Sequence, residues 1–188
     1  MALGDENSIS SMMKDITVES ELSLIKIIAK KDINQTEIGG YKINDQEEGS
    51  KFEVPKWVAS ILSDMDLIEF VDDGIEIEVF KALNQEKLLG NQLSELRPDL
   101  YKKINFLLKN WKNKLSNDHE LIQNYEKLST SLLDLINIRI SKIIALASLS
   151  YPPDDLHKHL TSEEFLLFDN VQKQIQEWRN SMVGEENV

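Results

Sequence analysis

Residues 21–28 (ELSLIKII) and residues 52–62 (FEVPKWVASIL) decide the fold that the sequence predicts. The first stretch is apolar and typical of a strand. The second contains Pro55, and proline suits the first turn of a helix because it has no N–H to satisfy there and its φ angle is already nearly helical. We therefore predict a strand, then a loop-rich passage with Gly39 and Gly40, then a helix that begins at Pro55.

The helix from Pro55 is expected to be amphipathic. Apolar residues recur at intervals of three and four and fall on one face: Val54, Trp57, Val58, Ile61, Leu62 and Met65. We expect strands over 22–28, 67–71 and 75–80 to cover this face, the last two joined by a turn over 72–74. In 75–80, apolar and charged residues alternate, which predicts one buried and one solvated strand face.

After residue 80 the apolar period changes to that of helices, which places a domain boundary near residue 82 and a hinge over 82–94, where Gly90 and Asn91 interrupt the pattern. The predicted fold class is α+β. The expected organisation is a flexible tail over 1–15, a small α+β domain over 16–82, and an all-α helical bundle over 83–188.

Three long helices are predicted in the second domain. The first begins near Asp99, after Pro98, and ends near Ser116. The second covers about 118–148, with an N-cap from the segment 116–118. The third opens with a capping box made by Thr161 and Glu164; residues 152–160 before it are a loop or a short turn of helix.

The second helix is apolar over most of its circumference after residue 132, so neighbours should cover more than one side of it. One chain of this length offers few such neighbours, which predicts contact with another subunit. Charged residues within the stretch, such as Asp134 and Lys142, argue against a membrane span. The predicted interface consists of Leu132, Leu135, Ile136, Arg139, Ile140, Lys142, Ile143 and Leu146. We expect Arg139 and Lys142 to meet carboxylates of the bundle or of a partner.

Composition excludes several classes of function. The 188 residues contain no cysteine, which rules out disulfides, thiolate nucleophiles and cysteine-bound zinc and favours an intracellular protein. The net charge of −12 makes the chain a poor DNA binder by itself. No phosphate-binding loop occurs. His157 and His159 have a spacing that could hold a metal on a strand, but in a loop such a pair is more often a surface feature. We expect no enzyme, no cofactor and no metal.

The order of these segments resembles a known family. Val54, Pro55, Trp57, Val58 and Ala59, with Leu62 in the same small-domain core, are similar to the Val-Pro-x-Trp-[Leu/Val]-Ala helix of GINS replication subunits of the two–three class. Arg139, Lys142 and Ile143 resemble the Arg-x-x-Lys-[Ile/Leu] helix common to GINS subunits. The resemblance covers about residues 19–182, and the lysine- and isoleucine-rich short form looks like an archaeal subunit.

The resemblance implies a non-catalytic scaffold in DNA replication. It implies a sister GINS subunit of opposite domain order, in a tetramer of two kinds of chain, that bridges the MCM helicase and a RecJ-like protein, with primase as a further partner and DNA contacted only indirectly. The location would be the cytoplasm of an archaeon, or the nucleus of a eukaryote. The alternative is a transcription regulator with a winged-helix-like domain, although residues 55–65 offer only Lys56 as a basic residue for DNA.

Overall fold

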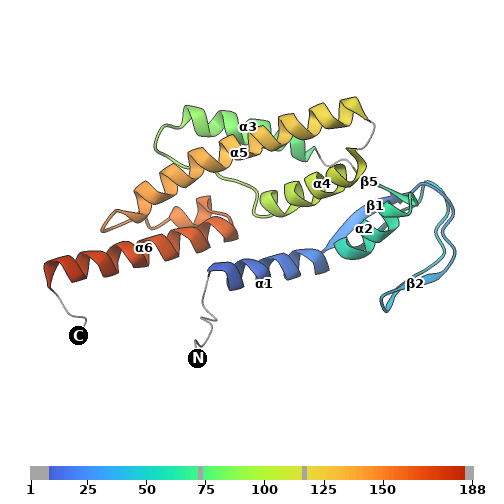
Figure 1. The fold of residues 1–188 in the computed structure, drawn as a ribbon, viewed down its shortest axis with the longest axis horizontal. Helices are drawn as coiled ribbons and strands as arrows, with labels where there is room; N and C mark the ends of the chain where they lie inside the picture. The colour runs from blue at the N-terminus through green and yellow to red at the C-terminus, as the bar shows by residue number, and fades with distance from the viewer. Residues whose placement is uncertain (1–8, 72–73, 116–117, 185–188) are drawn as a thin grey trace. The chain divides into compact units, whose positions relative to one another are not determined.

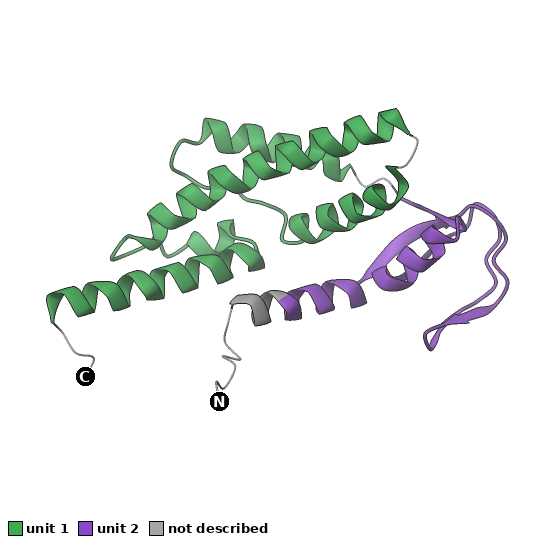
Figure 2. Ribbon diagram, viewed as in Figure 1, with its two compact units in different colours: residues 1–11, 74–188 green, residues 12–73 purple. Residues whose placement is uncertain are grey.

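The computed structural model describes residues 9–71, 74–115 and 118–184, with the backbone alone for residues 9–13. The fold is α+β, as predicted, because strands gather in the first part of the chain and helices fill the second (Figure 1). The chain divides into two compact units (Figure 2). Residues 12–73 form the small unit, and residues 74–188 together with the first eleven residues form the helical unit. The division therefore falls between residues 73 and 74, earlier than the predicted boundary near residue 82.

A three-stranded antiparallel sheet lies in the small unit. Its central strand, β1 (Leu24–Ala29), pairs with β4 (Lys51–Pro55) on one side and with β5 (Ile68–Phe70) on the other. Ile27 faces Phe52 in one pair and Phe70 in the other, which puts apolar side chains on one face of the sheet. The opposite face carries the exposed ion pair between Lys26 and Glu53.

Helix α2 (Lys56–Asp64) begins after Pro55, which occupies the N-cap position. Three residues of the predicted stripe, Val54, Val58 and Leu62, are at most 1% exposed, and so is Ala59 beside them. The stripe is not buried throughout, because Ile61 is 39% exposed and Met65 is 59% exposed. Full burial of a Val or Leu side chain contributes about 1.5–3 kcal/mol each. The four buried side chains therefore supply much of the stability of the small unit.

A second sheet of two strands was not predicted. β2 (Thr36–Ile38) and β3 (Tyr41–Ile43) form a hairpin whose two-residue turn is Gly39-Gly40. Both turn residues have positive φ angles, the conformation that two-residue hairpin turns favour and that glycine adopts without strain. A bridge between Ile33 and Gln46 continues the ladder beyond the hairpin.

The segment before the sheet corrects one prediction. Helix α1 (Ile9–Leu22) occupies residues 9–15, which were predicted as part of a flexible tail, and it also includes the first residue of the predicted strand, Leu22. Residues 1–8 of the predicted tail lie outside the described ranges.

The named helices that the structure describes between residues 74 and 184 are α3 (Ile75–Leu88), α4 (Leu100–Lys114), α5 (His119–Ala147), the 3₁₀ segment η2 (Leu156–His159) and α6 (Ser162–Val183). The prediction of a strand over 75–80 was wrong, because these residues open α3. Ile77, which the strand was expected to bury, is 59% exposed. The predicted turn over 72–74 falls mostly on residues outside the described ranges.

The helix caps that the structure describes at Asp118 and Thr161 agree with those predicted from the sequence. The Asp118 carboxylate accepts hydrogen bonds from the backbone N–H groups of Glu120 and Leu121 at the start of α5. At the start of α6, Thr161 and Glu164 form the predicted capping box. The remainder of the predicted cap at 116–118 lies outside the described residues.

Two apolar clusters pack around α5. The larger joins α3, α4 and the first half of α5: Ile75, Val79, Ala82, Leu83, Leu96, Leu100, Ile104, Leu128, Leu132 and Leu135. The smaller joins the end of α5 to η2 and α6: Leu93, Ile143, Ala147, Leu156 and Phe168. On α5, the gap between the two clusters is the segment after Leu135 and before Ile143.

Candidate functional site

Arg139 and Lys142 occupy the gap between the two apolar clusters of α5. They lie three residues apart, which places both on the buried side of the helix. Arg139 is 0% exposed and Lys142 is 8% exposed. An unpaired charge in such a position costs several kcal/mol, so both cations need partners within the bundle.

Every N–H of the Arg139 guanidinium has an acceptor. Nε and Nη2 donate to the two carboxylate oxygens of Glu164. Nη1 donates to the carboxylate of Glu86 and, at 3.0 Å, to the carbonyl oxygen of Ser94. Nη2 also donates to the carbonyl oxygen of His159 at 2.7 Å. A guanidinium has five N–H groups, so these five bonds satisfy all of them.

The Lys142 ammonium is satisfied in the same way. Nζ donates to the Glu86 carboxylate, to the Glu86 carbonyl oxygen at 2.9 Å and to the Gln92 carbonyl oxygen at 2.7 Å. These three acceptors match its three N–H groups. With two cations and the two carboxylates of Glu86 and Glu164, the network is electrically balanced.

Glu86 ties α3 to the loop that follows it. Its side chain is 0% exposed, and its Oε1 accepts from the Ser94 backbone N–H at 2.8 Å and from the Ser94 hydroxyl at 2.6 Å. Burial by itself would raise the pKa of Glu86, but hydrogen bonds from Lys142 and Ser94 and the charge of Arg139 outweigh burial and lower that pKa.

Glu164 has two functions in the structure. Oε2 accepts from the Thr161 backbone N–H at 3.0 Å, which completes the capping box of α6, and the same carboxylate pairs with Arg139. Oε1 also accepts from the Tyr101 hydroxyl at 2.7 Å, which brings α4 into the network. Burial, with the nearby Glu164 charge, raises the pKa of the Tyr101 phenol.

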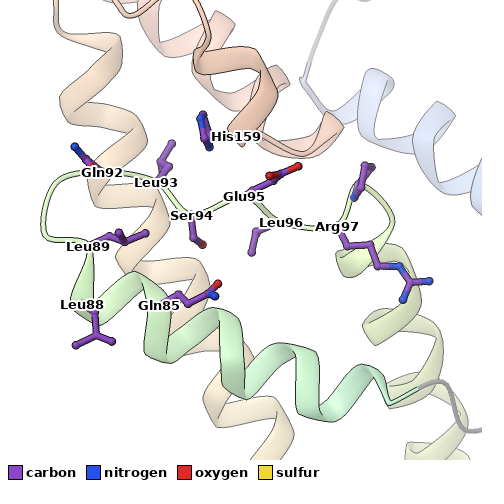
Figure 3. A pocket seen from close by; sticks show the side chains of 11 residues that line it. Gln85, Leu88, Leu89, Gln92, Leu93, Ser94, Glu95, Leu96, Arg97 and His159 are labelled. Atoms are coloured by element: carbon purple, nitrogen blue, oxygen red, sulfur yellow. The ribbon is translucent and has the colours of Figure 1, made fainter.

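A hollow of about 790 Å³ lies beside this network within the helical unit, around the loop between α3 and α4 (Figure 3). Its lining mixes leucines with polar groups, among them the amides of Gln85 and Gln92 and the ring of His159. The His159 Nδ1 atom is buried without a hydrogen-bond partner. Ser94 belongs to both the hollow and the network, so a molecule in the hollow would contact the loop that Arg139 and Lys142 hold.

The residues predicted to form a subunit interface fall into two groups. Five are buried inside this chain: Leu132, Leu135, Arg139, Lys142 and Ile143. Ile136, Ile140 and Leu146 are partly exposed. The first five residues are thus part of the chain's own bundle, and a partner could meet only the other side of α5. The prediction that Arg139 and Lys142 meet carboxylates is confirmed.

The family-motif residues of the small unit lie together at the junction of β4 and α2. Pro55 is buried with the four apolar residues described above, and Trp57 is half-buried. Each motif of the resemblance therefore contributes to packing within its own unit.

The carboxylates of the network were missed in the sequence. Glu86 was placed in a hinge, although it follows Val79 and Leu83 by seven and three residues and so continues their apolar face. A carboxylate on the same helix face as buried apolar residues indicates a buried ion pair, because a buried carboxylate needs a cation. This pattern could have identified Glu86. Glu164 was assigned only its capping function.

A comparison with models of known protein families and a comparison with curated proteins both gave no match. Among the described helices, none is both long enough and apolar enough to cross a membrane. Within the described ranges, no group of three or more His, Asp or Glu side chains is arranged to hold a metal ion. His157 is exposed on η2, where its Nδ1 lies 3.1 Å from the carbonyl oxygen of Asp154.

Proposed function

We propose that this chain is a non-catalytic scaffold subunit of the GINS type. The observation that carries the proposal is the complete pairing of Arg139 and Lys142 inside the helical unit. Arg139 and Lys142 are the two charged residues of the segment that resembles the shared GINS motif. Their hydrogen bonds to α3, α6 and the loop over 92–97 connect these elements to α5. Such a rigid unit suits a protein that positions other proteins.

The same geometry disfavours catalysis at this network. A catalytic group must reach a substrate, whereas Arg139 and Glu86 are at most 1% exposed and every cationic donor is already engaged. Charged groups that are buried and fully paired hold structure together.

In this proposal the partners are those that the resemblance implies. The chain assembles with a sister subunit of opposite domain order into a tetramer of two kinds of chain. That tetramer bridges the MCM helicase and a RecJ-like protein, with primase as a further partner. DNA is reached through these proteins, since a net charge of −12 opposes direct binding to phosphates.

Co-expression with the sister GINS subunit of the same organism tests the proposal. We expect native mass spectrometry to show a complex that contains both chains, and we expect a tag on either chain to retain the MCM helicase from a mixture of purified proteins. The tagged sister subunit without this chain is the control. Failure of the two chains to form a complex at micromolar concentration would contradict the proposal.

A DNA-binding measurement separates the scaffold from the regulator. For the chain alone, we expect fluorescence anisotropy with duplex and single-stranded DNA to give only weak binding, with dissociation constants of about 10⁻⁴ M or above at physiological salt. The slope of log K against log salt should be shallow because few phosphates are neutralised. Submicromolar, steeply salt-dependent binding would favour the winged-helix-like regulator instead.

A further inference from the structure

We propose that the hollow around the loop between α3 and α4 binds a basic segment of a partner protein, in which a lysine stands next to a large apolar residue. The hollow of about 790 Å³ has the size of a ligand-binding pocket, which is about 300–1,000 Å³. Its lining comes from residues between 85 and 98 and from His159, all within the helical unit. This site is independent of the GINS assignment, because the chain's own residues define it.

The wall formed by residues 92–97 is held in place by the buried network behind it. The carbonyl oxygen of Gln92 accepts a hydrogen bond from Lys142 at 2.7 Å. The carbonyl oxygen of Ser94 accepts one from Arg139 at 3.0 Å, and the N–H and hydroxyl groups of Ser94 are engaged as well. A wall that is fixed before a ligand arrives loses less conformational entropy on binding. The network therefore pre-organises the hollow for a ligand.

The charges of the lining favour a cationic ligand. Among the described lining residues, Arg97 is the only lysine or arginine, and its guanidinium already pairs with Glu78 and Asp99. The Glu95 carboxylate is exposed and forms no ion pair with any described residue. A phosphate or an acidic peptide would therefore meet an unpaired carboxylate and an occupied cation, whereas an ammonium group would meet a complementary charge.

The C-terminal end of α3 adds to the negative potential. The last carbonyl groups of a helix have no N–H partner within the helix, and the helix dipole is negative at that end. One of these carbonyl groups, that of Glu86, already accepts a hydrogen bond from the Lys142 ammonium at 2.9 Å. This end of α3 thus binds one ammonium group within the chain itself. Leu88 and Leu89, which end the helix, also line the hollow, so a ligand there meets the same negative end.

An apolar residue beside the lysine is needed to cover the leucines of the hollow. Leu88 is 85% exposed and Leu89 is 40% exposed, whereas Leu93 and Leu96 are each 8% exposed. Removal of apolar surface from water contributes about 25 cal/mol per Å². A large apolar side chain against the exposed leucines therefore supplies binding energy that a lysine by itself does not.

The amides of Gln85 and Gln92 fit the backbone of such a segment. A primary amide offers donors and an acceptor, as a peptide group does. Figure 3 shows Gln85 on α3 and Gln92 on the loop beyond it, and both residues are exposed. Because the edge of the hollow is open to solvent at Leu88, a polypeptide can enter and leave it at both ends. These features favour a peptide over a small amine.

An NMR titration of the full ¹⁵N-labelled chain with acetyl-Gly-Leu-Lys-Leu-Gly-amide at pH 7.5 tests the site. We expect the amide signals of residues 85–98 and the imidazole signal of His159 to shift, with a Kd of about 1 mM. The imidazole of His119, which is exposed and outside the lining, should not shift. The peptide with glutamate in place of lysine should bind at least about fivefold more weakly, because its charge is opposite.

Two exposed positions of the lining test the two parts of the ligand. Glu95→Gln should weaken binding of the lysine peptide by about threefold, as expected for an exposed ion pair. Glu177→Gln, an exposed position of α6 outside the lining, is the matched control. Leu89→Ser should weaken binding by about fivefold through lost apolar contact. Its control is Leu133→Ser on α5, where the leucine is 59% exposed and outside the lining.

Three outcomes would overturn the proposal. The first is the absence of shifts in residues 85–98 at about 10 mM lysine peptide, ten times the expected Kd. The second is equal binding of the lysine and glutamate peptides, which would remove the charge argument. The third is binding of n-hexylammonium as tight as that of the lysine peptide, which would assign the hollow to a small amine. Because the titration uses this chain alone, its result is separate from that of co-expression with the sister subunit.

Discussion

Trp57 lies directly against Gly39. A Cβ atom added to Gly39 would stand only 2.9 Å from Cη2 of the indole ring, closer than side chains pack. The turn of the β2–β3 hairpin therefore rests on α2, and the contact joins the two-stranded sheet to the helix that covers the three-stranded one. Glycine is needed at position 39 both for this close approach and for its φ angle of +55°.

Substitution of Gly39 by alanine should therefore destabilise the small unit more than the same substitution at Gly40. Both positions have positive φ angles, so each should lose about 1–2 kcal/mol of unfolding free energy through backbone strain. Only position 39 adds the clash with Trp57, because nothing lies within 4 Å of a Cβ at position 40. Urea unfolding followed by tryptophan fluorescence measures the difference. Equal losses for the two variants would show that the hairpin moves away from Trp57 without cost.

Arg139→Ala should cost about 3–5 kcal/mol of unfolding free energy, because it leaves Glu164 buried without its cation and removes one of the two cations that pair with Glu86. Lys142→Ala should cost less, since Glu86 keeps its bonds from Arg139 and Ser94. Lys173→Ala, which removes an exposed ion pair with Asp169, is the control and should change stability by less than about 0.5 kcal/mol. If Arg139→Ala and Lys142→Ala both lowered the unfolding free energy as little as the control does, the network would not be what stabilises the bundle.

The stability of the chain should depend on pH through Glu86. The pKa of Glu86 is lower in the folded chain than the unfolded value near 4.5, so the folded state is favoured above that value. This contribution should disappear as the pH falls from about 5 through the lower pKa of the folded state. The urea midpoint at a series of pH values measures it. In Glu86→Gln, the part of the pH dependence of the urea midpoint that comes from residue 86 should be absent. An unchanged pH dependence would assign the acid sensitivity to other carboxylates.

Tyr101→Phe should remove one hydrogen bond from Glu164 and little else. Hydrogen bonds to charged groups contribute about 1.5–3 kcal/mol, which sets the expected loss of unfolding free energy. Tyr151→Phe is the control, because Tyr151 is 92% exposed and its hydroxyl remains in water after folding. Because the pKa of the Tyr101 phenol is raised, its ultraviolet signal should also fail to titrate in alkali until the chain unfolds. A loss no larger than that of the control would mean that Arg139 alone positions Glu164.

Long periodic segments could be predicted from the sequence, and short ones could not. The apolar spacing that begins at Pro55 and the capping box at Thr161 each gave the correct helix, since many residues or a specific pair support each assignment. Residues 75–80 were too few to distinguish alternation from the start of a helix. Only the continuation through Val79 and Leu83 reveals the helical period, and Glu76 in the first turn favours a helix start as well.

The contacts of the candidate site could likewise be predicted only in part. The spacing of Arg139 and Lys142 within an apolar stretch predicts that carboxylates meet them. It does not say which carboxylates, because Glu86 and Glu164 lie 53 and 25 residues away from Arg139 in the chain. Pairings over such separations depend on how the helices pack, which one sequence does not display.

The sharing of Glu164 between Arg139 and the α6 cap also orders events at the ribosome. Residue 164 is made 25 residues after residue 139, which at about 5–20 residues per second is a delay of about one to five seconds. Because residues leave the ribosome in chain order, Arg139 emerges before the carboxylate that pairs with it bidentately. A bundle that closed early would trap this charge, so the last helix to emerge completes the neutralisation that closure requires. We therefore expect the helical unit to close only after α6 has left the ribosome.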